Sequence, residues 1–388
     1  MAYLTKSRLK PGNRKFAHNR KPVDRGVVEF DLIDQYFNRP FRPLSQTRRE
    51  TVLSGIGDDC ATLAMLPGYH LYVSTDTMVE GVHFFSDHPA YDLGWKALAC
   101  NLSDLAASGA TPMGFTLSLT LPRVSDAWLS SFSQGLLALA QQSICPLVGG
   151  DTTSAGPGGT LSVSITVLGQ APSSQSGFAR HCAVVDDDVW VSGLPGLARV
   201  GLMSEFASRQ MWAELGATAS EQQAVAKILA GLPPDLLAQA KVALQTPEPQ
   251  LELSRKLVGH AHACIDLSDG LSGDLGHISK ASACGIQIVQ SDVDALWLSR
   301  FPALGFNGRV EPSTMAFLRH ASLVGGDDYQ LCWTADPRSR KAVESLLPNP
   351  ARVGTVATGH GVWLLQPNSP PVNMLSLSYD HFKVTSRE

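Results

Sequence analysis

The sequence predicts a mixed α/β (α+β) protein made of two lobes. In residues 115–121 and 161–167, apolar residues alternate strictly with Ser and Thr, which predicts two half-buried strands. Between them, Ser125 precedes apolar residues at helical spacing and so caps a predicted helix. A Ser-, Pro- and Gln-rich segment at 171–177 then separates this half from a second half of similar make-up.

The other elements are predicted from the same two patterns, alternation of apolar residues for strands and helical spacing of apolar residues for helices. In the first half, the pattern predicts helices at 29–38 and 90–108 and strands at 70–76 and 144–148, with a polar loop after the first helix. In the second half, it predicts strands at 188–193, 262–266, 329–335 and 361–366 and helices at about 199–215, 219–231 and 270–282. The expected domains are residues 28–172 and 178–388, preceded by a basic segment at 1–27.

The charge distribution separates that basic segment from an acidic body. Residues 1–25 contain eight Lys or Arg and one acid, whereas the rest contains 23 Lys or Arg and 34 Asp or Glu, a net charge of −11. An acidic body argues against a nucleic-acid-binding surface. We interpret the basic segment as a disordered extension, or as residues ahead of the true start; RNA binding and targeting stay open as alternatives.

Chain-wide patterns favour a cytoplasmic enzyme with no membrane partner. No apolar stretch approaches the roughly 18 residues of a membrane span, and the N-terminus lacks the apolar core of a signal peptide. The seven cysteines are dispersed and include no Cys-x-x-Cys pair. This usage predicts buried free thiols in a reducing compartment.

Seven aspartates lie in five short motifs rich in Gly, Ser and Thr. The motifs are Gly55-Ile-Gly-Asp-Asp-Cys-Ala61, Ser74-Thr-Asp-Thr77, Asn101-Leu-Ser-Asp104, Gly149-Gly-Asp-Thr152 and Ile265-Asp-Leu-Ser-Asp-Gly270. We expect them at strand ends and helix starts that converge on one pocket. Carboxylates a few ångströms apart force one another to protonate unless cations neutralise them. Because Mg²⁺ combines one or two carboxylates with water and phosphate oxygens, the motifs predict a magnesium–polyphosphate site.

The absence of other catalytic signatures leaves phosphoryl transfer assisted by metal ions as the predicted chemistry. The sequence contains no Walker A loop, no protein-kinase signature, no zinc spacing and no Ser/His/Asp arrangement. Positioning and charge neutralisation do most of the catalysis in such reactions. A phosphate monoester acceptor, with its second pKa near 6, is already ionised at neutral pH and needs no general base. We accordingly identify no catalytic base.

The order and spacing of these motifs resemble the thiamine-monophosphate kinase family, within the wider aminoimidazole-ribonucleotide-synthetase-like superfamily. The likeness extends from about residue 28 to residue 383. Gly81-Val-His-Phe84 and Tyr379-Asp-His-Phe382 point to the thiamine-phosphate branch. The resemblance implies a synthetase-like fold in which the N-terminal mixed-sheet domains of a homodimer form a shared barrel and a C-terminal α/β domain closes each site. It also implies direct transfer of the γ-phosphoryl group of ATP to thiamine monophosphate.

The resemblance further assigns roles by position. The implied ligands of several Mg²⁺ ions are Asp59, Ser74, Thr75, Asp76, Asp104, Asp151, Asp266 and Asp269. The implied ATP contacts are Gly150, Asp151, Arg180 and Ser268, and the implied thiamine-phosphate contacts are His83, Asp327 and Tyr379. Arg180 presents a fork of donors suited to phosphate, and Gly150 allows close approach of the backbone. Asp126, Asp274 and His277 resemble ordinary capping or helix-surface residues, and we leave them out.

Three segments depart from the family pattern. Gly325-Gly-Asp-Asp-Tyr-Gln330 replaces the usual Gly-Gly-Glu-Asp-Tyr-Glu, so that Asp327 is one methylene shorter and Gln330 lacks a charge. Thr246-Pro-Glu-Pro-Gln250 replaces a basic tract, and Val184-Val-Asp-Asp187 replaces Lys-Pro-Gly-Asp. These departures affect the substrate lobe and leave two alternatives open. One is another ATP-dependent enzyme of the superfamily, and the other is a relative that only binds nucleotide or thiamine phosphates.

Overall fold

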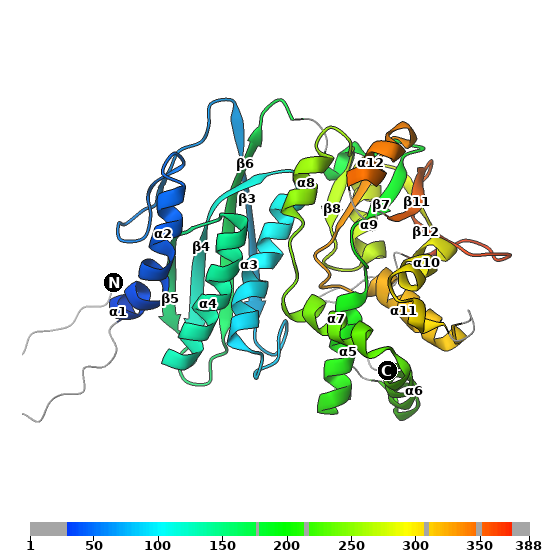
Figure 1. Ribbon diagram of the computed structural model, residues 1–388, viewed down its shortest axis with the longest axis horizontal. Helices are drawn as coiled ribbons and strands as arrows, with labels where there is room; N and C mark the ends of the chain where they lie inside the picture. The colour runs from blue at the N-terminus through cyan, green and yellow to red at the C-terminus, as the bar shows by residue number, and fades with distance from the viewer. Residues whose placement is uncertain (1–28, 176–177, 213–216, 306–309, 347–350, 375–388) are drawn as a thin grey trace, which may run out of the picture.

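The computed structural model describes residues 29–175, 178–212, 217–305, 310–346 and 351–374, and divides them between two lobes (Figure 1). The predicted basic segment and the predicted substrate residue Tyr379 lie outside these ranges. Within them, no helix combines the length and apolar character that crossing a membrane requires. The cysteines are all free and five are buried, as predicted.

The first lobe is a four-stranded sheet covered on one face by two helices. The strands lie in the order β3-β6-β4-β5, and only the β4–β5 pair is parallel. Their bounds are β3 (Tyr69–Val79), β4 (Thr111–Leu121), β5 (Leu147–Ser154) and β6 (Ser162–Pro172). Helices α3 (Ala90–Ala107) and α4 (Asp126–Ser143) pack side by side against the sheet (Figure 1).

Strict alternation in β4 and β6 explains this one-sided packing. The odd residues from Phe115 to Leu121 and from Val163 to Val167 are buried beneath the helices, whereas the Ser and Thr residues between them point to the other face. The Ser125 hydroxyl accepts a hydrogen bond from the Trp128 N–H and caps α4, as predicted. The sheet therefore has one apolar face and one hydroxyl-lined face.

Two predictions for the first lobe are wrong. The helix expected at 29–38 continues, as α1 (Glu29–Leu32), a π-helical segment (Ile33–Asn38) and α2 (Arg39–Thr47), because Phe41 and Leu44 extend its buried side. The strand expected at 144–148 begins later and contains the Gly149-Gly150-Asp151 motif, since Ile144 still ends α4 in the left-handed conformation. A small hairpin of β1 (Val52–Ser54) and β2 (Thr62–Leu63) carries the first aspartate motif.

The second lobe is built on a seven-stranded sheet in the order β13-β12-β9-β11-β7-β10-β8. The strands are β7 (Asp188–Val191), β8 (Cys264–Asp266), β9 (Gly285–Val289), β10 (Leu331–Ala335), β11 (Ala351–Ala357), β12 (Gly361–Leu365) and β13 (Val372–Asn373). The helices are α5 (Leu197–Arg209), α6 (Ala219–Gly231), α7 (Pro234–Gln245), α8 (Leu251–Leu257), α9 (Leu271–Ser282), α10 (Gln290–Arg300), α11 (Pro312–Val324) and α12 (Arg340–Leu346). Short 3₁₀ segments lie at Arg180–Cys182, Pro302–Leu304 and Pro337–Ser339. Strands β9 and β11 and helices α7, α8, α10, α11 and α12 are additions to the sequence prediction.

The two lobes share part of their hydrophobic core. On β10, Leu331 and Trp333 belong to the same buried cluster as the α3 residues Leu98 and Leu102, whereas Cys332 belongs to the core of the second lobe. One face of this part of the second sheet therefore packs toward the first lobe. β6 ends at Pro172, and the Phe178 N–H already bonds to the second lobe.

Candidate functional site

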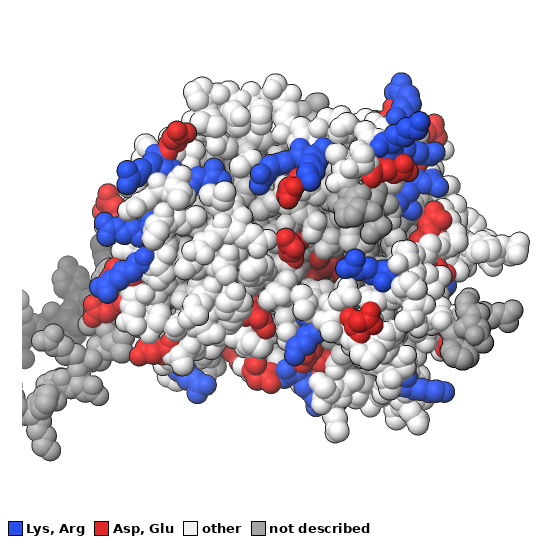
Figure 2. Space-filling model, in the orientation of Figure 1, with Lys and Arg blue, Asp and Glu red and all other residues white. Residues whose placement is uncertain are grey.

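A cleft of about 1240 Å³ lies between the lobes and receives aspartates from both. Asp76 comes from β3, Asp104 from α3, Asp266 from the end of β8, and Asp269 from the turn before α9. On the face drawn in Figure 2, acidic side chains gather between the two lobes. His83, Arg180, Ser268 and Asp327 also line this cleft. Eight of the predicted site residues are thus brought together.

The first-lobe carboxylates are held by the packing of β3 against α3. Ser74 and Asp76 share the face of β3 that packs on the helix, and the Ser74 hydroxyl donates to Asp104 Oδ2 at 2.5 Å. The backbone N–H of Asp76 donates to the side-chain oxygen of buried Asn101 at 3.1 Å. These aspartates therefore lie within elements, in mid-strand and in the last turns of a helix, which corrects the expectation that all would lie at strand ends and helix starts.

The convergence of these carboxylates raises their pKa values. Burial, followed by the charge of Asp104, raises the pKa of Asp76 to about 6 and that of Asp266 to about 7. Burial also raises the pKa of Asp104, against the lowering effects of the Ser74 hydroxyl and the Arg180 guanidinium. The cluster therefore disfavours its own negative charge, and oxygen-binding cations suit it for that reason.

The turn that presents Ser268 and Asp269 is shaped by a residue that the sequence prediction set aside. Asp274, on α9, is buried and accepts hydrogen bonds from the backbone N–H groups of both residues at 3.1 Å. Burial and the charges of Asp266 and Asp269 raise the pKa of Asp274 well above its ordinary value. Asp274 is therefore not a helix-surface residue, because it fixes the backbone of the acidic turn.

The cleft also receives two of the three residues predicted to contact thiamine phosphate, His83 and Asp327. His83 lies in the turn after β3, and its Nδ1 accepts the N–H of Val79 at 3.0 Å. Asp327 forms an ion pair with Lys96 of α3, Nζ to Oδ2, at 3.0 Å, and accepts the Tyr329 hydroxyl at 3.1 Å. Sequence reasoning missed Lys96. Its signal was a lone lysine, eight residues before Asp104, in an otherwise apolar stretch of helix.

The loop that carries His83 is attached to the second lobe. Arg209 of α5 forms a bidentate pair with Asp87 at 2.5 and 2.6 Å, and its guanidinium lies 4.5 Å from the centroid of the Phe85 ring. Phe85 in turn meets Phe206 edge-on, with ring centroids 5.4 Å apart. These contacts add an aromatic wall to the second-lobe side of the cleft.

Five of the described predicted site residues do not line the cleft, and of these only Ser74 bonds to a lining residue, Asp104. Asp59 is exposed beside the β1–β2 hairpin. Thr75 points to the opposite face of the sheet, where its hydroxyl bonds to Thr166 at 2.8 Å. Asp151 lies in register with Ser118 on that same hydroxyl-lined face. Packing alone requires glycine at position 150, because a Cβ there would lie 2.0 Å from the carbonyl oxygen of Leu117.

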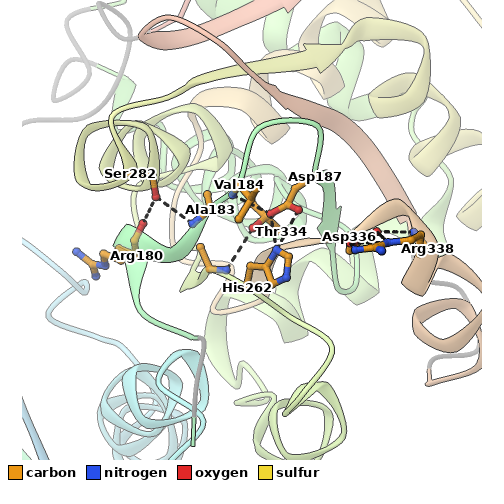
Figure 3. A network of polar contacts seen from close by, with 10 residues as sticks. Arg180, Ala183, Val184, Asp187, His262, Ser282, Thr334, Asp336 and Arg338 are labelled. Atoms are coloured by element: carbon orange, nitrogen blue, oxygen red, sulfur yellow. Dashed lines mark hydrogen bonds and ion pairs between the residues drawn. The ribbon is translucent and has the colours of Figure 1, made fainter.

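Arg180 is positioned through its backbone by the C-terminal end of α9. The Ser282 hydroxyl donates to the Arg180 carbonyl at 2.8 Å and accepts the Ala183 N–H at 3.1 Å, and the Arg180 side chain points away from this network (Figure 3). Farther along, buried Asp187 accepts the Val184 N–H at 3.0 Å and contacts His262 Nδ1 at 2.9 Å (Figure 3). The divergent turn at 184–187 is therefore a structural support outside the cleft.

Only one of the divergent positions lines the cleft, namely Asp327. The Gln330 side chain accepts a hydrogen bond from the Ser192 hydroxyl at 2.8 Å, away from the cleft. The tract at 246–250 packs on the first lobe, where the Pro247 carbonyl accepts the Trp95 indole N–H at 2.8 Å. The departures from the family pattern thus leave the cleft lining largely unchanged.

Comparison with known proteins agrees with the residue pattern. Residues 57–171 match the family described as AIR synthase related protein, N-terminal domain. A thiamine-monophosphate kinase of Haemophilus influenzae is 36% identical over 362 residues, covering 92% of this chain and 98% of that protein. The crystal structure of thiamine-monophosphate kinase from Stenotrophomonas maltophilia is 34% identical, with a TM-score of 0.68 over 87% of this chain and 96% of that one. A structure described as AaThiL complexed with AMPPCP and TMP has the same fold, with a TM-score of 0.60 at 24% identity, over 91% of this chain and 97% of that one.

Proposed function

Because the chain belongs to the thiamine-monophosphate kinase family, we propose that it transfers the γ-phosphoryl group of ATP directly to thiamine monophosphate, giving thiamine diphosphate and ADP. The observation that carries the proposal is the cleft itself, whose lining includes both an acidic cluster and the Lys96–Asp327 pair. The acidic cluster suits the metal-bound polyphosphate of the donor, and the Asp327 carboxylate suits a cationic acceptor. Helix α3 contributes a residue to each, Asp104 and Lys96.

The acidic cluster fits Mg²⁺. Carboxylates from four segments converge there, and burial, followed by the charge of Asp104, raises the pKa values of Asp76 and Asp266. We propose that Asp76, Asp104, Asp266 and Asp269 hold several Mg²⁺ ions, with the Ser74 hydroxyl orienting Asp104. Bound Mg²⁺ would supply neutralisation of phosphate charge during transfer.

The remaining side chains act on the substrates. Arg180, which already lowers the pKa of Asp104, offers a guanidinium fork to the ATP phosphates, and the Ser268 backbone is fixed by Asp274 beside it. His83 and Asp327 face the acceptor, together with Tyr379, whose role stays a prediction outside the described residues. The proposal assigns no general base, because the acceptor phosphate is ionised at neutral pH.

We further propose that the protein acts as a cytoplasmic homodimer whose first-lobe sheets form a shared barrel. Within the described ranges, no helix packs on the hydroxyl-lined face of the sheet, and its edge strand β3 exposes Leu71 (46%) and Val73 (57%). An open edge with exposed apolar side chains favours pairing with another strand. Thr75 and Asp151 lie on this face, so we expect assembly to decide whether they, with Asp59 and Gly150, join the site.

Product analysis tests the proposal. The purified protein is mixed with ATP, Mg²⁺ and thiamine monophosphate, and the nucleotides and thiamine esters are separated by chromatography. We expect thiamine diphosphate and ADP in equal amounts, with both lost when EDTA is added. ADP without thiamine diphosphate would indicate a different acceptor, and ATP binding without any product would indicate a binding relative.

A further inference from the structure

We propose that Lys96 is a positioning residue that orients the Asp327 carboxylate toward the acceptor substrate. The inference rests on the proposed function, since it concerns how that cleft recognises thiamine monophosphate. It adds a residue of the first lobe to a recognition surface otherwise supplied by the second lobe and by the loop of His83.

The geometry leaves Asp327 little freedom. Lys96 Nζ lies 3.0 Å from Oδ2, and the Tyr329 hydroxyl donates to Oδ1 at 3.1 Å, so each carboxylate oxygen has its own donor. The side chain of Lys96 is only 2% exposed, whereas that of Asp327 is 34% exposed and lines the cleft. The pair therefore presents a partly exposed carboxylate to the cleft beside an ammonium group that is almost fully buried.

The backbone of Asp327 is fixed as well. Its N–H donates to the Ser268 carbonyl at 3.0 Å, and the Tyr329 N–H donates to the Leu267 carbonyl at 2.8 Å. Asp327 adopts the left-handed conformation, with φ of +67°, which Asp tolerates better than most side chains. The backbone thus ties Asp327 to the acidic turn of the second lobe, while its side chain is tied to α3 of the first.

A buried lysine needs a functional or structural reason. Removing an ammonium group from water costs several kcal/mol. The ion pair with Asp327, which is partly exposed, offsets only part of this desolvation cost. Lys96, Cys100 and Asp104 follow one another at four-residue intervals, and all three line the cleft. At about 1.5 Å per residue, Lys96 and Asp104 are separated by about 12 Å along one rigid helix. Helix α3 therefore links the position of the acceptor carboxylate to the position of the acidic cluster.

The substrate chemistry matches a carboxylate held in this way. Thiamine monophosphate carries a fixed positive charge on its thiazolium ring, and its phosphate must meet the donor phosphate at the acidic cluster. A carboxylate whose two oxygens each accept from a protein donor still has lone pairs available to the cleft, where a cationic ring is attracted. Without Lys96, the shorter Asp327 side chain could turn away from the acceptor, and alignment would suffer.

The test compares Lys96→Met with Trp95→Phe. Met keeps the length of the side chain without its charge. Trp95, the neighbouring residue on α3, also contacts the second lobe, through Pro247, but does not line the cleft. We expect Lys96→Met to raise KM for thiamine monophosphate about 10–100-fold, the effect of losing a hydrogen bond to a charged group, with KM for ATP within about twofold. Trp95→Phe should leave both KM values within about twofold of wild type.

Two further variants separate positioning from folding. Lys96→Ala should regain activity with thiamine monophosphate on addition of ethylammonium chloride but not sodium chloride at equal ionic strength, because only the amine replaces the lost donor. If Lys96→Met does not fold, the double variant Lys96→Met/Asp327→Asn, which removes both charges together, should fold and show the same KM for thiamine monophosphate as Asp327→Asn alone, because Lys96 acts only through that carboxylate; a further rise in the double variant would contradict this.

Three results would overturn the inference. They are unchanged KM values in folded Lys96→Met, an equal rise in both KM values, and the absence of rescue by the amine. Failure of the proposed function can be told apart from failure of this inference. If the proposed function is wrong, wild-type protein forms no thiamine diphosphate, and both proposals are rejected. Active wild type with any of the three results rejects the role of Lys96 alone.

Discussion

Without cations, the protein should lose stability as the pH rises, and Asp266 should account for a large share of the loss. Burial and the charge of Asp104 raise the pKa of Asp266 from 3.8 to about 7. Between about pH 4 and pH 7, the folded protein therefore retains a proton that the unfolded chain has released, so its contribution to stability is complete below pH 4 and is lost as the pH rises. At about 1.4 kcal/mol per pKa unit, this shift corresponds to at most about 4 kcal/mol.

Urea unfolding followed by tryptophan fluorescence measures this effect. Wild type and Asp266→Asn are compared at pH 5 and pH 8, each in EDTA and in excess MgCl₂. We expect wild type in EDTA to lose more stability between the two pH values than Asp266→Asn, by up to about 3 kcal/mol, because part of the loss already occurs below pH 5. Mg²⁺ should stabilise wild type more at pH 8 than at pH 5, because cations bind ionised carboxylates.

Asp328 supplies a matched control. Burial raises its pKa to about 7 as well, but it accepts the backbone N–H groups of Gly196 and Ala198 at the start of α5 and does not line the cleft. Asp328→Asn should therefore change the pH dependence and leave the response to Mg²⁺ intact. The reasoning is refuted if Asp266→Asn shows the pH dependence of wild type, or if Mg²⁺ stabilises wild type equally at both pH values.

Three further predictions concern other parts of the chain. Asp59→Asn and Asp151→Asn should each reduce turnover by orders of magnitude in an ADP-release assay, and near-normal turnover in either variant would remove that residue from the proposed metal ligands. Asp327→Glu restores the side chain usual in the family and should leave thiamine diphosphate formation similar or better, whereas its collapse would indicate a pocket rebuilt for another ligand. Asp186→Gly should raise the free energy of unfolding by about 1 kcal/mol, because Asp186 has a φ of +74°; a lower urea midpoint would contradict this.

Periodicity predicted the elements that bury one side and failed where burial follows a different pattern. Residues 115–121 were assigned correctly because alternate side chains enter the core. Strand β5 was misplaced because it lies at the edge of the sheet, and its Gly, Asp and Thr residues show no apolar alternation. Strands β9 and β11 were missed because each places only a few apolar residues around a Gln or a Gly, a pattern too short and irregular to tell from a loop or a helix segment.

Motifs singled out the aspartates, but they did not predict which of them meet. In Ser74-Thr-Asp-Thr77, successive side chains point to opposite faces, so Asp76 enters the cleft and Thr75 does not. Lys96 and Asp274 belong to no motif used in the sequence prediction. Their roles depend on partners far along the chain or in a separate turn, and only the folded structure brings these groups together.

The shared core explains why the acidic cluster persists without relaxing. Carboxylates from two lobes could reduce their repulsion if the lobes moved apart, but the apolar cluster that joins Leu98 and Leu102 to Leu331 and Trp333 would then be exposed to water. Burial in the cleft, together with the charge of Asp104, instead raises the pKa values of Asp76 and Asp266. A cleft held in this way keeps its oxygen ligands in place before any cation arrives, so that binding costs little reorganisation.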